Sequence, residues 1–316
     1  MRIGWIGVHA EGIPALEAVA AAGYQIAGVM TLRSSKADRR CGSVDYHSVC
    51  RRLGVPVAEV DHVNDATSIE QLRNWNCDLL VVLGWGQILG PDVLNVATLG
   101  VVGAHASFLP HNRGSAPVNW AIINGETSTG NSLMWLSEGV DSGDLIDQRF
   151  FAISPYDTCA TIYEKVAESN RDMLLQLLSE LRAGRRPGRS QPHSGEPLLP
   201  RRRPEDGQIN WHSSSTDIYN LVRGVTRPYP GAFTFLSDGK WWIWNVAVLP
   251  PFMSGVPPGT VLGPVRSPEQ NACGQMIATT DGAVVVLEAE DAQGRVYSGY
   301  SLSELDWSGK RVSYAA

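Results

Sequence analysis

Short apolar runs alternate with helix-forming segments in the N-terminal part of the chain, and this alternation constrains the fold more than any other feature. Residues 1–8 form an apolar run, residues 15–22 are rich in alanine, and residues 24–31 are apolar again. A strand, a helix and a second strand in this order predict a parallel sheet with helices on its faces. The run 78–87 (DLLVVLGWGQ) is the most hydrophobic and is predicted to be a central strand.

The composition predicts two domains. Residues 1–184 are predicted to form a doubly wound, mostly parallel α/β domain, whose last helix contains the apolar positions between 162 and 181. The segment 185–204 is rich in proline and arginine and is predicted to be a linker. Residues 205–316 contain short strand-like runs broken by glycine, proline and aspartate, which predict a small β-barrel-like, OB-like domain with one helix near 216–225.

The bulk properties exclude several functional classes. A net charge of -6 and a pI near 5.7 disfavour a protein that binds nucleic acid through its overall field. The basic segment 182–203 lacks interleaved aromatic side chains, so a solvated linker is favoured there over a nucleic-acid patch. No apolar run approaches the roughly 18 residues of a membrane span, and no secretory signal pattern is present, so we expect a cytoplasmic protein. The five cysteines are scattered without metal-ligand spacing, which predicts free thiols and no metal site.

The exit of the predicted central strand is a candidate ligand site. Residues 84–89 (GWGQIL) contain two glycines where a flat ligand could approach the backbone closely. A plain turn from strand to helix explains the same residues equally well. Gly4, Gly7 and Gly12 lack the GxGxxG spacing, so the sequence does not favour a nicotinamide or flavin site.

His105 and Asp141 are the candidate catalytic pair. His105 ends the run GVVGAH, and the ends of strands in α/β sheets are places where catalytic groups are presented. A lone histidine is more often structural, but Asp141 closes the next predicted strand, and neighbouring strands can bring a carboxylate to an imidazole. Such a pair can transfer a proton near neutral pH. The GxSxG and HExxH motifs are absent, so neither a serine hydrolase nor a zinc protease is supported.

Three separated motifs carry a resemblance to a known family. Residues 105–130 (HASFLPHNRGSAPVNWAIINGETSTG) resemble the HGSLLPxxRGxAP signature of the 10-formyltetrahydrofolate-dependent formyltransferases. Residues 140–148 (VDSGDLIDQ) resemble the aspartate loop of that family. Residues 201–211 and 221–233 resemble the C-terminal module shared by methionyl-tRNA formyltransferase and the sugar-nucleotide N-formyltransferases. Within the family, the sequence is most similar to the formyltransferase half of the enzyme that modifies UDP-4-amino-4-deoxyarabinose.

The resemblance implies a role for each matching residue. It implies that His105 is the catalytic imidazole, that Asp141 orients it, and that an unprotonated amine attacks the formyl carbon of 10-formyltetrahydrofolate without a metal. The positions that match the walls of the folate pocket are Trp85, Gly86, Gln87, Ile88, Leu89, Asp141 and Asp144. The positions that match the acceptor side are Ser107, Arg113, Asn119 and Trp120, and the arginine there suits a phosphate.

The sequence departs from the family at Gly103. The family has an asparagine two residues before its histidine, and the amide of that asparagine donates to the developing oxyanion. Loss of one such donor typically costs ~10²–10³ in rate. Three explanations are open. Another donor, such as Asn131 or a water, replaces the amide; the enzyme is slow or uses another acyl donor or reaction; or the domain has lost catalysis and only binds ligands.

The predicted function is therefore N-formylation of the amine of a small acceptor, with a nucleotide-linked amino sugar as the first choice. Formylation of a hydroxylamine such as N-hydroxyornithine in siderophore biosynthesis, or of methionyl-tRNA, uses the same chemistry. A non-catalytic protein that binds folate or a sugar nucleotide is the alternative of a different class. The pair Asn119-Trp120 replaces the Gln-Arg that methionyl-tRNA formyltransferases usually have, which disfavours the tRNA. The tryptophans at 241, 242 and 244 predict barrel core, with a homodimer interface as the alternative.

Overall fold

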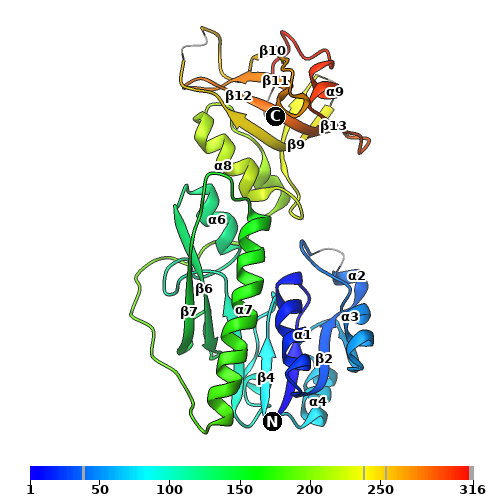
Figure 1. Cartoon of the computed structure of the whole chain (residues 1–316), viewed down its shortest axis with the longest axis vertical. Coiled ribbons are helices and arrows are strands. Elements are labelled where there is room, and N and C mark those ends of the chain that lie inside the picture. The colour runs from blue at the N-terminus through cyan, green and yellow to red at the C-terminus, as the bar shows by residue number, and fades with distance from the viewer. Residues whose placement is uncertain (38–39, 238, 253–254, 313–316) are drawn as a thin grey trace. The chain divides into compact units, whose positions relative to one another are not determined.

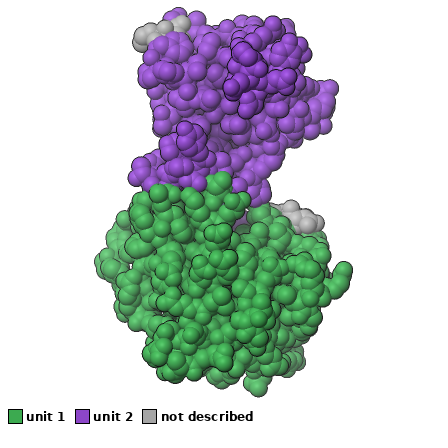
Figure 2. Space-filling view, viewed as in Figure 1, with its two compact units in different colours: residues 1–117, 128–152, 161–200 green, residues 118–127, 153–160, 201–316 purple. Residues whose placement is uncertain are grey.

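The computed structural model describes residues 1–37, 40–237, 239–252 and 255–312, and these form two compact units (Figure 2). Unit 1 comprises residues 1–117, 128–152 and 161–200, and unit 2 comprises residues 118–127, 153–160 and 201–316. Each unit therefore combines segments that are distant in the sequence. The domain limits predicted at residues 184 and 205 stay a prediction.

Unit 1 is built on a seven-stranded sheet. Its strands are β1 (Arg2–Ile6), β2 (Gln25–Leu32), β3 (Val57–Val60), β4 (Leu79–Val82), β5 (Gly100–His105), β6 (Ser128–Trp135) and β7 (Leu145–Ala152). Their order is β3-β2-β1-β4-β5-β6-β7, and Figure 1 labels β2, β4, β6 and β7 of this sheet. The first five strands in this order pair in parallel, whereas β6 is antiparallel to both of its neighbours. The predicted doubly wound, mostly parallel sheet is confirmed.

Helices cover both faces of this sheet because the side chains of each strand alternate between the faces. The helices are the 3-10 helix η1 (Ala10–Gly12) and the α-helices α1 (Ile13–Ala21), α2 (Ser34–Ala37), α3 (Tyr46–Leu53), α4 (Ala66–Trp75), α5 (Pro91–Leu94) and α7 (Cys159–Arg182). One core joins α1, α3 and α7 to a face that includes Val81 and Val102. A second core joins α4 and α5 to the opposite face, which includes Val82 and Val101.

The strand order creates a switch point at the carboxyl edge of the sheet, next to the candidate residues. After β1 the chain continues to β2 on one side, whereas β4 leads to β5 on the other side. In open α/β sheets, ligands bind outside the carboxyl ends of the strands at such a switch point. The segments that follow β1 and β4 begin there, and His105 is the last residue of β5, the neighbour of β4.

Unit 2 contains a six-stranded antiparallel sheet and a helix packed on it. The strands are β8 (Ala232–Leu236), β9 (Gly239–Val248), β10 (Val261–Val265), β11 (Gly274–Ala278), β12 (Ala283–Glu290) and β13 (Val296–Ser298). The helices are α6 (Pro117–Ile123), η2 (Pro204–Gly207), α8 (Ser215–Val225), η3 (Gln270–Ala272) and α9 (Tyr300–Ser303). The predicted β-rich C-terminal part with one early helix, α8, agrees with this antiparallel sheet.

One local difference separates the predicted elements from the structure. Asp141 does not close a strand, because β6 ends at Trp135 and Asp141 lies in the loop before β7. Of the tryptophan run, Trp241 is buried against Trp307, with ring centroids 4.8 Å apart, as expected for core.

Candidate active site

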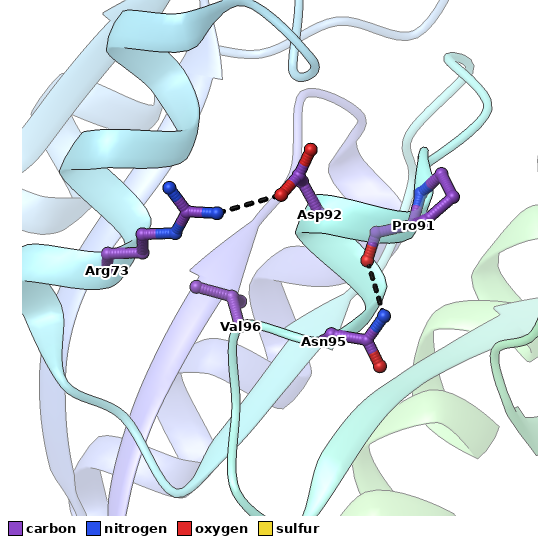
Figure 3. Close-up of a pocket in the computed structure, with 5 residues that line it drawn as sticks. All are labelled: Arg73, Pro91, Asp92, Asn95 and Val96. Atoms are coloured by element: carbon purple, nitrogen blue, oxygen red, sulfur yellow. Dashed lines mark hydrogen bonds and ion pairs between the residues drawn. The ribbon is translucent and has the colours of Figure 1, made fainter.

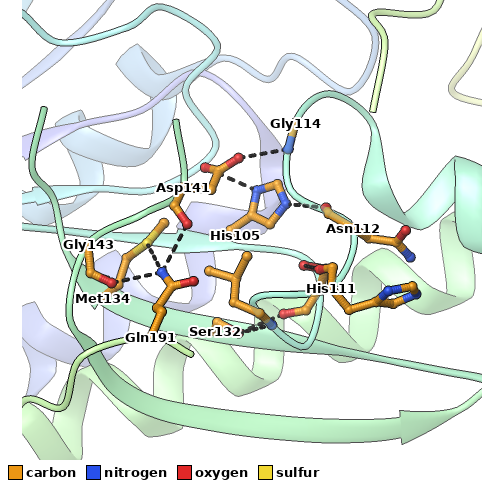
Figure 4. A network of polar contacts seen from close by, with 11 residues as sticks. His105, His111, Asn112, Gly114, Ser132, Met134, Asp141, Gly143 and Gln191 are labelled. Carbon is orange, nitrogen blue, oxygen red and sulfur yellow. Dashed lines mark hydrogen bonds and ion pairs between the residues drawn. The ribbon is translucent and has the colours of Figure 1, made fainter. Parts of the chain in front are cut away.

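The sheet presents His105 at its carboxyl edge, almost buried, with 8% of its surface exposed. The Nε2 atom lies 2.8 Å from the carbonyl oxygen of Asn112 (Figure 4). Because a carbonyl can only accept, Nε2 carries a hydrogen in this contact. The other ring nitrogen, Nδ1, lies 3.4 Å from Oδ1 of Asp141, longer than the ~2.7–2.9 Å of a charged hydrogen bond. Nδ1 is therefore the ring nitrogen that can accept a proton, and it faces a carboxylate.

Asp141 is held from two sides in the loop between β6 and β7. Its Oδ2 atom accepts a 2.9 Å hydrogen bond from the backbone N–H of Gly114, and its own carbonyl oxygen accepts from Gln191 (Figure 4). Its backbone has φ of 50°, in the left-handed region, which costs a residue other than glycine about 1–3 kcal/mol. Such a conformation persists only where the surrounding contacts maintain it.

The turn after β5 supplies the other contacts of the pair. Asn112 has φ of 57°, in the left-handed region, and its carbonyl oxygen accepts from His105 Nε2. A Cβ at Gly114 would lie 2.5 Å from the carbonyl oxygen of Leu199, so only glycine fits there. Ser132 of β6 braces the start of the turn, because its hydroxyl donates to the Ser107 carbonyl at 2.7 Å and accepts from the N–H of Leu109 at 3.0 Å.

Leu136 fills the space beside Gly103 where the family asparagine would stand. A Cβ at Gly103 would lie 2.9 Å from both Cδ1 and Cδ2 of Leu136 and 3.1 Å from its Cγ. The same leucine packs against the core on the α4 and α5 face and against Leu109 and Met134. An apolar side chain, not a polar group, therefore occupies the position beside the strand end.

The structure does not support Asn131 as a substitute donor. Cross-strand pairing places Ser132 opposite His105, so Asn131 points to the other face of the sheet. There its amide donates to Ser169 Oγ at 2.9 Å and to Asn170 Oδ1 at 2.6 Å, both in α7. These bonds use the N–H groups of Asn131 on the opposite side of the sheet from His105.

Some of the residues matched to the folate pocket are exposed, and others are held by contacts within the fold. Gly86 and Ile88 are exposed, and Ile88 has 73% of its surface open. Gln87 is committed to structure, because its side chain accepts from the Val63 N–H at 2.8 Å and donates to the Asp61 carbonyl at 3.1 Å. Leu89 and the ring of Trp85 pack on the core of the α4 and α5 face. Asp144 is exposed, and its carbonyl accepts from the N–H of Trp135.

The residues matched to the acceptor side fall in different parts of the molecule. Ser107 is buried and donates to the His111 carbonyl at 2.7 Å, and Arg113 Nη2 donates to the Ser194 carbonyl at 3.2 Å. Asn119 and Trp120 belong to unit 2. There the Asn119 amide donates to the Gly224 carbonyl at 2.7 Å, and the Trp120 ring lies under the Arg202 guanidinium, 4.7 Å from it. The amide of Asn119 therefore binds the backbone of α8.

Two titratable groups lie where β1 meets the exit of β4. A Cβ at Gly84 would lie 2.8 Å from His9 Cβ and 3.2 Å from Glu11 Cγ, so both side chains approach that exit closely. Burial raises the pKa of Glu11 from 4.5 to about 7. Burial, and then the charge of Arg40, lower the pKa of His9 from 6.5 to about 4. His9 is therefore neutral at pH 7, and Glu11 ionises near it.

Sequence reasoning missed four residues around the pair: Asn112, Ser132, Leu136 and Gln191. Asn112 lies inside the motif 105–130, next to the Arg-Gly pair of the family signature, whose Gly114 contacts Asp141. Gln191 lies in the segment predicted to be a linker, where nothing in the local pattern marks a contact with the site.

A separate polar pocket of about 280 Å³ lies in unit 1 (Figure 3). Its lining residues are Arg73, Pro91, Asp92, Asn95 and Val96. An ion pair of 2.8 Å joins Arg73 to Asp92 across it. None of the residues around His105 lines this pocket, so it is not the candidate active site.

Within residues 1–37, 40–237, 239–252 and 255–312, no three His, Cys, Asp or Glu side chains gather in a way that could hold a metal ion. In the same ranges, no helix has the length and apolarity needed to cross a membrane.

Comparison with known proteins identifies two matching family models. Residues 12–178 match the model described as formyl transferase, and residues 202–304 match the model of the formyl transferase C-terminal domain. Together these matches cover both the segment with His105 and Asp141 and most of the C-terminal part.

Solved structures with a similar fold include three kinds of protein, each below 25% identity. WlaRD, a sugar 3N-formyl transferase, is 16% identical, with 90% of this chain and 96% of that chain covered and a TM-score of 0.64. HypX from Aquifex aeolicus in complex with tetrahydrofolic acid is 18% identical, with 95% of this chain covered and a TM-score of 0.65. This chain spans just under half of HypX, 46%. Methionyl-tRNA formyltransferase from Clostridium thermocellum is 18% identical, with 79% and 94% covered and a TM-score of 0.59.

Proposed function

The chain belongs to the formyl transferase family, and from this premise we propose that it transfers a formyl group from 10-formyltetrahydrofolate to the amine of a small soluble acceptor. One observation carries the proposal. His105 and Asp141 lie side by side at the carboxyl edge of the sheet, and separate backbone groups hold each of them. A histidine and a carboxylate in this arrangement can transfer protons, and formylation of an amine requires proton transfer.

The proton transfers define the roles of the pair. When bound, 10-formyltetrahydrofolate supplies an activated formyl carbon that the lone pair of a neutral amine attacks. The attacking nitrogen then carries a proton too many, and the departing N10 nitrogen needs one. His105 accepts the first proton at Nδ1 and returns it toward N10, while Asp141 balances the positive charge on the ring. The carbonyl of Asn112 fixes the ring by its contact with Nε2.

The exit of β4 fits a planar ligand such as a pterin. Gly86 is in open space, because the nearest atom to a Cβ built there is Arg40 Nη1 at 3.8 Å. The indole N–H of Trp85 is buried and has no hydrogen-bond partner among the described residues. The backbone at Gly86 is therefore open to the contacts that hold a flat ring.

A nucleotide-linked amino sugar is the acceptor we favour. The likeness to WlaRD extends over nearly the full length of both chains, which supports a sugar acceptor. The net charge of -6 disfavours methionyl-tRNA, and N-hydroxyornithine remains a rival with the same chemistry. A second candidate, a ligand-binding homologue with weak or no transfer, is favoured by Leu136, which puts an apolar group where the family places its oxyanion donor.

The test is to incubate the purified protein with 10-formyltetrahydrofolate and a panel of amines, and to follow release of tetrahydrofolate. The panel contains nucleotide-linked amino sugars, N-hydroxyornithine and methionyl-tRNA, and the Asp141→Asn variant is the control. We expect release with an amino-sugar nucleotide, and at least tenfold less with the variant. Binding of 5-formyltetrahydrofolate is measured in parallel by calorimetry. Binding without release for every amine would overturn the proposal in favour of the ligand-binding homologue.

A further inference from the structure

The segment 185–200, which we call the crossing segment, passes along both loops that contact His105. Near its start, Arg189 exchanges two backbone hydrogen bonds of 2.8 and 2.9 Å with Leu145, the first residue of β7. Near its end, the Leu199 N–H donates to the Arg113 carbonyl at 2.7 Å, and the Ser115 N–H donates to the Leu199 carbonyl at 3.0 Å. The segment predicted to be a free linker is therefore anchored on each side of the site.

Gln191 lies between these anchors and bonds directly to the backbone around Asp141. Its Nε2 atom donates to the carbonyl oxygens of Asp141 at 2.9 Å and of Gly143 at 2.8 Å (Figure 4). One amide has two N–H groups, so these contacts use both of them. Apart from Gln191, no residue outside the loop forms a hydrogen bond to the backbone of residues 137–143 within the part of the chain that the structure describes.

The loop needs such an anchor. Residues 137–140 are exposed, and Asp141 has a left-handed backbone. Gly143 is also constrained, because a Cβ there would lie within bonding distance of the Trp135 carbonyl. A loop with few packing contacts and a strained residue relaxes unless hydrogen bonds hold it.

We propose that Gln191 is a positioning residue, which acts through Asp141 and holds its carboxylate against His105 and Gly114. The proposal deepens the proposed function and rests on it for its effect on turnover. Gln191 touches neither His105 nor the reacting atoms, so its role is indirect. Since a misplacement of about 1 Å can cost 10²-fold in rate, we expect Gln191→Leu to lower kcat at least tenfold.

A double-mutant cycle with Asp141→Asn separates positioning from general support of the fold. If Gln191 acts through the Asp141 carboxylate, Gln191→Leu costs at least tenfold in the wild type and less than threefold in Asp141→Asn. Equal losses in both backgrounds would overturn the proposal. Ser190→Ala is the matched control, because Ser190 is the exposed neighbour in the same segment, and we expect its kcat to match the wild type.

A second measurement needs no turnover. The N–H of Gly114 donates to Asp141 Oδ2, so its hydrogen exchange, followed by NMR, reports where the carboxylate lies. We expect exchange at Gly114 to be at least tenfold faster in Gln191→Leu and unchanged in Ser190→Ala. Unchanged exchange in Gln191→Leu would overturn the proposal even if activity fell. If Gln191→Leu speeds exchange at Gly114 but the wild type formylates no amine, the positioning role of Gln191 is supported and the proposed function is rejected. Gln191→Glu, which keeps the size but loses both donors, serves if the leucine variant does not fold.

Discussion

Replacing Gly103 by asparagine tests whether Leu136 excludes the amide that the family places beside its histidine. The Cβ alone would lie 2.9 Å from two carbons of Leu136, closer than real Cβ atoms come to their neighbours. Leu136 cannot yield freely, because it packs against two apolar clusters. Overpacking of this kind costs about 1–3 kcal/mol. We therefore expect Gly103→Asn alone to lower the free energy of unfolding by that amount.

Removing the leucine should reduce the cost of Gly103→Asn. Leu136 is half-buried, so Leu136→Ala costs less than the ~2–5 kcal/mol typical of a fully buried leucine. In the double variant the asparagine enters the space that Leu136 leaves. The two costs then do not add, and we expect a coupling free energy of about 1–2 kcal/mol in favour of the double variant.

The assay combines urea unfolding with the rate of tetrahydrofolate release. Gly103→Ala, alone and with Leu136→Ala, is the matched control because it adds the Cβ without the amide. If the missing oxyanion donor limits the rate, Gly103→Asn with Leu136→Ala should exceed its alanine counterpart by ~10²–10³-fold.

Two results would refute this reasoning. An unfolding midpoint of Gly103→Asn equal to that of the wild type would show that Leu136 moves away without cost. Equal rates for the asparagine and alanine double variants would show that the reaction is not limited by the missing amide. In that case His105 alone stabilises the oxyanion, or the protein catalyses a different reaction.

Three further predictions concern single residues. Asp141→Asn should lower kcat at least tenfold with little loss of stability, because the new amide keeps one oxygen to accept from Gly114; unchanged kcat would remove Asp141 from the mechanism. Asn131→Ala should cost about 1–3 kcal/mol in urea unfolding, because it leaves partners in α7 unpaired, while kcat stays within threefold; a hundredfold loss would restore Asn131 as a donor. Glu11→Gln should stabilise the protein above pH 7 and leave it unchanged below pH 4.5. The unfolded chain releases the Glu11 proton near pH 4.5 and the folded chain only near 7, so wild-type stability falls as the pH rises through this window, by up to about 3 kcal/mol. If Glu11→Gln and the wild type differed equally in urea midpoint at pH 4 and at pH 8, burial would not be what raises the pKa of Glu11.

The sequence predicts those parts of the structure that local patterns determine. The strands at residues 2–6 and 79–82, and the helix α7, follow from apolar runs and helical spacing that need no distant partner. The candidate pair was also accessible, because both residues lie in motifs with recognisable turn chemistry.

The neighbours of the pair depend on register, which the sequence does not reveal. Ser132 faces His105 only because β5 and β6 pair as they do, and a slip of one residue would bring Asn131 there instead. Both residues are polar and adjacent, so no local pattern distinguishes them. Leu136 beside Gly103 and Gln191 beside Asp141 are likewise set by tertiary contacts between distant segments.

Backbone strain is concentrated in the loops that hold His105. Of the four residues other than glycine that have positive φ in the described part of the chain, Asn112, Ala116 and Asp141 lie in these loops. The fourth, Asn76, ends α4 as a helix cap. Each such residue costs about 1–3 kcal/mol, which other contacts must offset. Asn112 is held by the contact of its carbonyl with His105. Asp141 is held by Gly114 and by the crossing segment, through Gln191. The geometry of the pair is therefore a property of three segments together, and substitution of Gln191 in the crossing segment should change activity even though the motif residues remain.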